Sequence, residues 1–158
     1  MVPRKAKRGG GFSLLELVIV VVIIAIIAAI AVPRLSRGTA GAADSALKGD
    51  LAVLRNALDL YNAEHNGSYP AVATFVEQLT TYTDVAGNDQ VTRDTTHIYG
   101  PYIRKIPSLP VGAAKGNTGA AAAAGAGVGW IYDAATGNIN ANCTDAEIDV
   151  EGVKYNTY

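Results

Sequence analysis

The sequence predicts an α+β fold in which one long N-terminal helix, transmembrane in its first half, packs on a small antiparallel sheet. Three observations predict it. An apolar run reaches Val32, a leucine stripe at helical spacing follows, and short strand patterns separated by turn residues occur near the C-terminus. A chain of 158 residues suits one small domain plus one additional element.

The charge distribution and the cysteine content argue against nucleic-acid binding and against a disulfide-stabilised domain. The formal net charge is −1, and four of the 13 basic residues lie within positions 1–11, so the rest of the chain is acidic. An acidic body does not attract anionic partners, and no nucleic acid is expected to bind. Cys143 is the only cysteine, which excludes an intramolecular disulfide.

The N-terminal segment indicates a membrane-spanning helix. Residues 1–11 are basic and end in three glycines, and residues 17–32 contain no polar side chain. From Phe12 onward, the apolar stretch is long enough to cross the hydrocarbon core, about 30 Å thick, as a helix. The basic flank is expected to stay in the cytoplasm, which places the C-terminal part on the other side. We therefore predict a leader at 1–11 and a transmembrane helix at 12–33.

Two simpler interpretations explain less of this segment. A cleaved secretory signal has a basic start and small residues at its end, as Ala29 and Ala31 provide, but this apolar run is long for such a signal. A plain membrane anchor explains the length but not Glu16, because a carboxylate deep in a membrane costs roughly 2.5–3.5 kcal/mol. The presence of Glu16 near the start of the apolar segment therefore indicates a functional role for its carboxylate.

The six residues from Gly11 to Glu16, Gly-Phe-Ser-Leu-Leu-Glu, resemble the processing site of type IV prepilins and of their relatives, the pseudopilins of type II secretion. The resemblance implies that a prepilin peptidase cuts between Gly11 and Phe12 and then N-methylates Phe12. It also implies that the apolar segment is retained and becomes the core of a filament. Pro33 falls where many members of the family have a helix-kinking proline.

The electrostatics of Phe12 and Glu16 agree with this resemblance. Cleavage removes the basic leader and leaves a positive amine on Phe12. In a filament whose apolar helices exclude water, Glu16 of one subunit can pair with the Phe12 amine of its neighbour. A buried charge is costly alone and tolerable when paired, so the pair favours one axial register. Assembly is therefore assigned to Phe12 and Glu16.

The helix is predicted to continue from Ser13 to about His65. Its second half, residues 34–66, is expected to be amphipathic and to need a sheet on one side. The apolar positions recur at steps of three and four, as on one face of a helix: Leu47, Leu51, Leu54, Leu58 and Tyr61.

Two further expectations concern the ends and bends of this helix. Asn66-Gly67 can end it in a left-handed conformation, and His65 is expected to be a solvated cap. Three glycines and Pro33 lie in or near residues 32–41 and weaken the helix, so we expect this stretch to be partly unwound in the filament.

Residues 67–158 are predicted to form the globular head. A short helix is expected at 72–81, and no clear element at 82–97. Residues 100–110 contain three prolines, which predicts an extended surface segment. Residues 112–129 are rich in glycine and alanine and are expected to be a flexible loop.

The sheet of the head is expected near the C-terminus. Residues 128–132 have a strand pattern, 133–138 a turn pattern, and 139–142 the pattern of a returning strand. A third strand is expected from residues 148–155. Three antiparallel strands over the amphipathic half of the helix would make a minimal α+β domain.

The head is most similar to that of the major pseudopilins of type II secretion systems. The resemblance is carried by residues 58–61 and 67–70 around the helix end, by Tyr102-Ile103-Arg104-Lys105-Ile106-Pro107, and by the hairpin at 130–142. Many adhesive type IV pilins close a C-terminal loop with a disulfide, whereas major pseudopilins generally do not. The single cysteine agrees with the second group.

Acidic residues alternate near the C-terminus. Asp145, Glu147 and Asp149, with Asn142 nearby, can offer Ca²⁺ the several oxygen ligands that it takes. Major pseudopilins use a calcium ion in their C-terminal loop, and residues 145–148 resemble that stretch, although the residues after them do not match it. The alternative interpretation is a solvated strand face with alternating charge.

No pattern predicts an enzyme. His65 and His97 are the only histidines, and neither neighbours a recognisable nucleophile or metal-ligand pattern. Cys143 has no second cysteine for a C-x-x-C motif, and we expect it to be a buried or idle thiol. The chain contains no P-loop and no G-x-S-x-G motif. No catalytic residue is assigned.

The sequence therefore predicts a structural subunit of a type II secretion pseudopilus. The resemblance implies a helical homopolymer, first held as a single-pass protein in the inner membrane with its head in the periplasm. It implies as partners the prepilin peptidase, an inner-membrane assembly platform, minor pseudopilins and, before assembly, the lipid bilayer. The alternatives are a type IV pilus subunit for adhesion, twitching or DNA uptake, and a membrane-anchored enzyme or binding protein.

Overall fold

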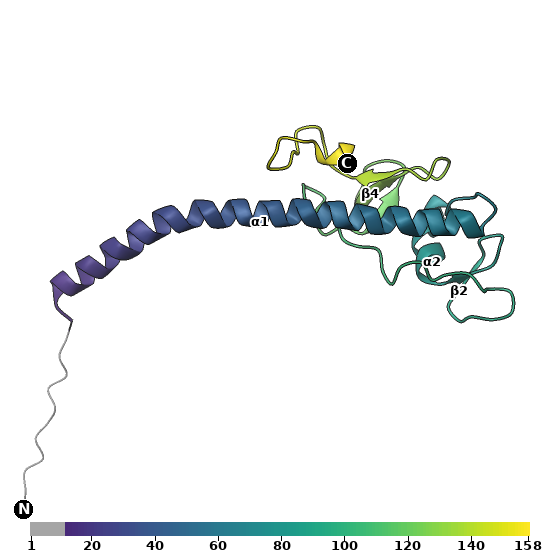
Figure 1. Cartoon of the computed structure of the whole chain (residues 1–158), viewed down its shortest axis with the longest axis horizontal. Helices are drawn as coiled ribbons and strands as arrows, with labels where there is room; N and C mark the ends of the chain where they lie inside the picture. Colours follow the sequence, from purple (N-terminus) through teal and green to yellow (C-terminus); the bar gives the residue numbers. More distant parts are fainter. Residues whose placement is uncertain (1–11) are drawn as a thin grey trace, which may run out of the picture. The chain divides into compact units, whose positions relative to one another are not determined.

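The computed structural model describes residues 12–158, apart from the side chains of residues 32–37. The chain divides into two compact units: one ends at Gly38, and the other, Thr39–Tyr158, contains both the second half of the helix and the head. The elements follow one another as α1 (Leu14–Glu64), η1 (Val72–Thr74), α2 (Phe75–Thr80), β1 (Tyr82–Thr83), β2 (Asp89–Gln90), β3 (Gly119–Ala121), β4 (Val128–Tyr132), β5 (Ile139–Ala141) and η2 (Tyr155–Thr157) (Figure 1). The predicted α+β class is confirmed.

The first helix agrees with its predicted bounds within one residue at each end. Helix α1 has 51 residues, and its assignment runs through position 33 without interruption. The side chain of Pro33 is not among those described, so the kink predicted at this residue stays a prediction. Asn66 and Gly67 have positive φ angles of 55° and 79°, and the Gly67 N–H donates to the Asn62 carbonyl, which ends the helix as predicted.

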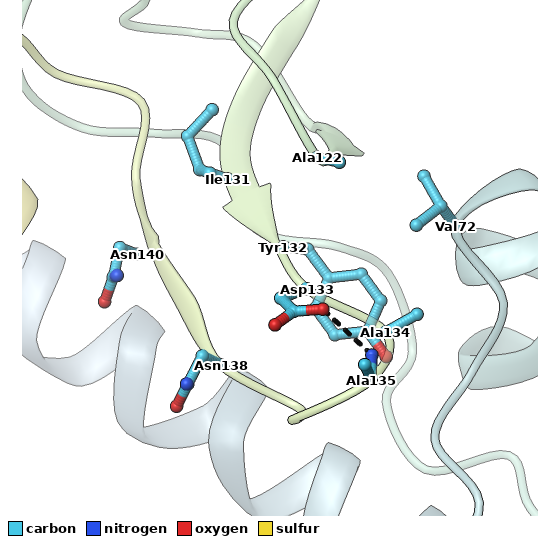
Figure 2. Close-up of a pocket in the computed structure, with 9 residues that line it drawn as sticks. All are labelled: Val72, Ala122, Ile131, Tyr132, Asp133, Ala134, Ala135, Asn138 and Asn140. Atoms are coloured by element: carbon cyan, nitrogen blue, oxygen red, sulfur yellow. Dashed lines mark hydrogen bonds between the residues drawn. The ribbon is translucent and has the colours of Figure 1, made fainter.

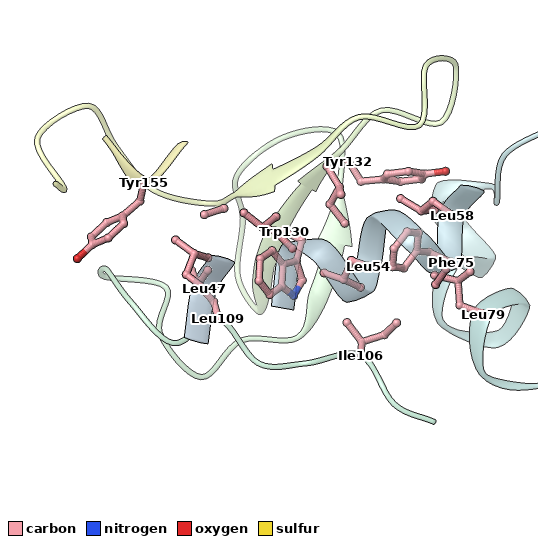
Figure 3. Close-up of a cluster of buried hydrophobic side chains, with 14 of the residues drawn as sticks. Leu47, Leu54, Leu58, Phe75, Leu79, Ile106, Leu109, Trp130, Tyr132 and Tyr155 are labelled. Carbon is pink, nitrogen blue, oxygen red and sulfur yellow. The ribbon is translucent and has the colours of Figure 1, made fainter. Parts of the chain in front are cut away.

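The core of the head forms between one face of α1 and the sheet (Figure 3). The leucine stripe of α1 is buried, and Trp130 and Tyr132 of β4 are fully buried beside it. The Trp130 indole N–H donates to the Pro107 carbonyl at 2.9 Å, and the Tyr132 hydroxyl donates to the Pro70 carbonyl at 2.8 Å. Both polar groups are therefore satisfied inside an apolar core.

The main sheet has the order β3-β4-β5 and corrects one prediction. Strands β4 and β5 are antiparallel as expected, with Trp130 opposite Ala141 and Tyr132 opposite Ile139. The third strand, however, is β3, which pairs with β4 in parallel and comes from the segment predicted to be a flexible loop. Residues 148–155 supply only an isolated bridge between Ile148 and Lys154.

Close backbone packing explains the glycines in this segment. A Cβ atom on Gly119 would lie 2.7 Å from the Gly127 carbonyl oxygen, and one on Gly129 would lie 2.3 Å from the Asn117 carbonyl oxygen. Both distances are shorter than any side chain tolerates, so only glycine lets the strands approach this closely. At these two positions glycine is required by packing, although the sequence alone suggested flexibility.

Residues 82–97, predicted to have no clear element, contain the small antiparallel pair β1-β2. The turn between the two strands is built by Asp84, whose carboxylate accepts hydrogen bonds from the Ala86 and Asn88 backbone N–H groups. Such a turn uses local polar side chains, so it leaves no hydrophobic pattern in the sequence.

His65 is buried, which contradicts the prediction of a solvated cap. Its ring stacks on Tyr61 at a centroid distance of 3.7 Å. Its Nδ1 lies 2.8 Å from the Tyr61 carbonyl oxygen, and its Nε2 lies 3.0 Å from the Thr83 hydroxyl. Strand β1 therefore covers the end of α1, and the histidine fills the contact.

Two leucines on α1 allow a matched test of this core. Leu58 is 1% exposed and Leu60 is 56% exposed. We expect Leu58→Ala to lower the free energy of unfolding by roughly 2–5 kcal/mol because it leaves a cavity. Leu60→Ala should change it by no more than about 0.5 kcal/mol. Urea unfolding of the detergent-solubilised chain, followed by the fluorescence of Trp130, its only tryptophan, measures both; equal losses would contradict the assignment of the packed face.

Candidate functional site

The candidate site is the beginning of α1 and the apolar segment behind it. One helix in the described part of the chain is long and apolar enough to cross a membrane, over Leu14–Ala31. All of its large side chains are exposed, because no other segment of residues 12–158 covers them. Glu16 is the only charged residue in this stretch. The segment therefore requires lipid or other apolar helices around it.

A capping box starts this helix. The Glu16 carboxylate accepts a hydrogen bond from the Ser13 backbone N–H at 2.8 Å, and the Ser13 hydroxyl accepts one from the Leu15 N–H at 3.3 Å. These bonds satisfy donors that the first turn of a helix otherwise leaves without partners. The carboxylate also lies at the positive end of the helix dipole. Local sequence alone therefore positions Glu16 at the helix start.

Sequence reasoning missed the role of Ser13. The signal was present, since a serine followed three residues later by a glutamate at the head of an apolar run is the pattern of a capping box. The arrangement gives Ser13 a positioning role, because it orients the side chain of Glu16.

The predicted assembly residues lie together at this end. Phe12 is 87% exposed, directly before the capping box. One oxygen of Glu16 bonds to Ser13, and among residues 12–158 no hydrogen bond reaches the other oxygen. That oxygen can accept a bond from a cation supplied by another chain. Gly11, the predicted processing residue, lies outside the described residues.

The predicted calcium ligands are each bound within the protein. The Asn142 amide donates to the Val128 carbonyl at 2.7 Å beside the sheet. Asp145 forms an ion pair with Lys154 at 2.6 Å and accepts a second bond from Asn156.

The other two carboxylates serve different loops. Glu147 accepts bonds from the Thr144 and Ala113 backbone N–H groups. Asp149 accepts bonds from backbone N–H groups of its own turn and from the Tyr158 hydroxyl. Within residues 12–158, no three His, Cys, Asp or Glu side chains gather in a way that could hold a metal ion. The four residues do not fit a calcium ion in this arrangement, and calcium binding stays a prediction.

The other reactive side chains have structural partners. Burial, and to a lesser extent the charge of Glu147, raises the pKa of the Cys143 thiol to about 11, which disfavours the reactive thiolate. The His97 ring nitrogen Nδ1 lies 3.0 Å from the Asp94 carboxylate, which also accepts bonds from the Thr96 and His97 N–H groups. The Thr96 hydroxyl also donates to Asp94 and lies 3.3 Å from the His97 Nδ1, so the three side chains together order an exposed loop.

A surface hollow of about 390 Å³ lies beside β4 and β5 (Figure 2). Its walls are mainly apolar, from residues such as Val72, Ile131 and Ala134. Its one acid, Asp133, accepts bonds from the Ala135 N–H and the Thr136 hydroxyl and so builds the β4–β5 turn. Two asparagines, Asn138 and Asn140, are the other polar side chains of β5 and its turn in the lining, and we assign no ligand to the hollow.

Comparison with known proteins supports the site at the beginning of α1. Residues 6–32 match the family model described as the prokaryotic N-terminal methylation motif. A search of curated proteins and a search of solved structures found no match. The chain thus carries a type IV pilin-like signal, which suggests a structural subunit of the pilin or pseudopilin kind and implies processing by a prepilin peptidase and assembly into a filament.

The ionised state of Glu147 should stabilise the head. Its pKa is lowered, chiefly because the Thr144 N–H and then the Ala113 N–H donate to the carboxylate. A lowered folded pKa gives stability that is present above the unfolded pKa of about 4.3 and is lost as pH falls through the folded value. We therefore expect Glu147→Gln to melt below the parent at neutral pH and to converge with it near pH 2–3, roughly.

Glu151→Gln is the control for this experiment, because Glu151 is exposed and its carboxylate receives no hydrogen bond within residues 12–158. Thermal melting of all three proteins, followed by Trp130 fluorescence, measures the effect. A gap between Glu147→Gln and the parent that is the same at both pH values would contradict the role given to the charge.

Proposed function

We propose that this chain is a structural subunit of a type II secretion pseudopilus, which polymerises through its N-terminal helix to help drive protein export. The observation that carries the proposal is an exposed apolar helix with a single acid, Glu16, positioned by Ser13 directly behind Phe12. The methylation motif over residues 6–32 supports it.

The proposed assembly proceeds from charge pairing at the helix start. Hydrolysis of the peptide bond between Gly11 and Phe12 releases the free amine of Phe12, and a methyl donor then supplies the methyl group that N-methylates it. When the apolar helices of several subunits pack together, water leaves and Glu16 needs a cation. The Phe12 amine of a neighbouring subunit supplies it, through the carboxylate oxygen that Ser13 does not occupy. Burial of the Glu16 carboxylate costs less free energy when it is paired with the Phe12 amine, and only one axial register of the neighbouring helices brings the two groups together.

The proposed parts of the chain follow from this scheme. Residues 1–11 are the leader that the prepilin peptidase removes, residues 12–33 are the transmembrane helix and later the filament core, residues 34–66 continue the helix, and residues 67–158 form the periplasmic head. Before assembly the subunit is held in the inner membrane. The assembly platform and minor pseudopilins are its proposed partners.

A type IV pilus subunit is the second candidate. The same helix start serves either filament, so the preference rests on the head. Cys143 cannot form a disulfide within the chain, and residues 102–107 and the hairpin of β4 and β5 resemble those of major pseudopilins. Adhesive pilins commonly close their C-terminal loop with a disulfide, which favours the pseudopilus.

Mass spectrometry of the N-terminal peptide tests the proposal. The peptide is taken both from filaments sheared off the cells and from the envelope that remains. We expect a chain that begins at methylated Phe12, retained mainly in the envelope. Abundance in the sheared filaments would favour a pilus. A chain that begins near Met1, or one that begins after Ala31, would overturn the proposal.

Two substitutions of Glu16 test the proposed charge pairing. Glu16→Gln keeps an acceptor for the Ser13 N–H but removes the charge, whereas Glu16→Ala removes both. We expect filament yield to fall at least roughly tenfold in both variants, because the Phe12 amine then lacks a charged partner. Ser13→Ala keeps Glu16 and the backbone N–H that positions it, and removes only the hydroxyl that accepts from the Leu15 N–H, so it is the control and should stay within about twofold. Immunoblotting of cross-linked envelope filaments measures the yield, and full assembly of Glu16→Gln would rule out charge pairing.

A further inference from the structure

The C-terminal segment of the head is fastened to α1 by five side chains, of which only Asp149 was among the predicted calcium ligands. Asp44 of α1 is only 4% exposed, although it is a carboxylate. Its two oxygens accept bonds from the Tyr155 hydroxyl at 2.7 Å and from the Val150 backbone N–H at 3.2 Å. These bonds connect Asp44 to residues more than 100 positions later in the chain, so they hold the C-terminal segment against α1.

A second contact lies one helical turn along α1. The Lys48 ammonium lies 4.8 Å from the centre of the Tyr158 ring, within the range of a cation–π interaction. The hydroxyl of the same tyrosine donates to Asp149. The Asp149 carboxylate also accepts bonds at 2.8 Å from the Glu151 and Val153 N–H groups, which forms the turn that carries Val150 to Asp44.

These five side chains, Asp44, Lys48, Asp149, Tyr155 and Tyr158, form what we call the C-terminal clamp. Each carboxylate in it is satisfied by protein donors. The same holds for Asp145, which pairs with Lys154, and for Glu147, which accepts backbone N–H groups, while Glu151, the last acid of the segment, is exposed. Calcium takes six to eight oxygen ligands. Gathering them here would break the ion pair and the turns that give the segment its shape.

We infer that the C-terminal clamp takes the structural place of a metal ion, so that the head folds and stays folded independently of calcium. In the clamp, two phenols hold the carboxylates by charge-assisted hydrogen bonds, and the Lys48 ammonium holds the ring of Tyr158 by a cation–π contact. A calcium-dependent loop would instead leave its carboxylates to repel one another when the ion is removed. The inference concerns only the head and is independent of filament assembly.

Thermal melting of the detergent-solubilised full chain tests this inference. Trp130 fluorescence is followed in millimolar calcium and in EGTA, for the parent and for Tyr155→Phe. We expect the melting temperature of the parent to differ by less than about 1 °C between the two conditions. Tyr155→Phe should melt roughly 5 °C lower in both, because the buried carboxylate of Asp44 loses a hydrogen-bond donor.

Tyr82→Phe is the matched control, since Tyr82 is half-buried and its hydroxyl has no hydrogen bond within residues 12–158. If Tyr155→Phe folds too poorly to melt, Tyr158→Phe serves instead, with limited proteolysis of the C-terminal segment as the readout. Faster cleavage than in Tyr82→Phe supports the clamp. Saturable one-to-one calcium binding that raises the melting temperature by several degrees would overturn the inference, as would a Tyr155→Phe or Tyr158→Phe variant that behaves like Tyr82→Phe.

Discussion

The contact between the leucine stripe of α1 and the residues around Trp130 holds the head together. With one cysteine in the chain, no disulfide can share this task, so burial of apolar surface supplies most of the stability. The side chains of Leu54 and Trp130 are fully buried, and the hydrogen bonds of Trp130 and Tyr132 to backbone carbonyls fix how the strand lies on the helix. Helix α2 adds Phe75 and Leu79 to this core, and the loops of the head depend on the packed face for their positions.

The first part of the same helix, unlike the second, has no packing partner within the described chain. Over Leu14–Ala31 every large side chain is exposed, and no described part of the chain covers it. Apolar surface of this extent is stable only in lipid or against other apolar helices. The single acid lies where the helix leaves its first backbone donors open, so Ser13 and Glu16 satisfy that end before any partner arrives. The carboxylate that starts the helix is thus the same one that the proposed charge pairing uses.

The elements that carry a regular apolar pattern in the sequence were predicted from that pattern. The helix Leu14–Glu64, the short helix near residue 75 and the hairpin of β4 and β5 all leave a regular apolar pattern, and their bounds were predicted closely. Strand β3 was missed because glycine and alanine carry no strand pattern, and only the close approach at Gly119 and Gly129 explains their presence. The burial of His65 was missed because it depends on strand β1, which arrives from later in the chain. Such contacts are tertiary, and no local pattern encodes them.

The acids near the C-terminus are compatible with two uses, a turn or a calcium loop, which the sequence does not distinguish. Turns and calcium loops both select aspartate and asparagine, the first because short polar side chains accept backbone N–H groups and the second because they supply oxygen ligands. Alternating acids therefore predict either use. The distinction depends on what lies opposite each carboxylate: Lys154 opposite Asp145, and two phenols opposite Asp44 and Asp149. A phenol donates a hydrogen bond to a carboxylate, whereas a metal ion accepts electron pairs from it, so the tyrosines fill with protein donors the positions that ligands of an ion would otherwise share. The partner across the fold, which no local pattern of acids reveals, therefore decides between the two uses.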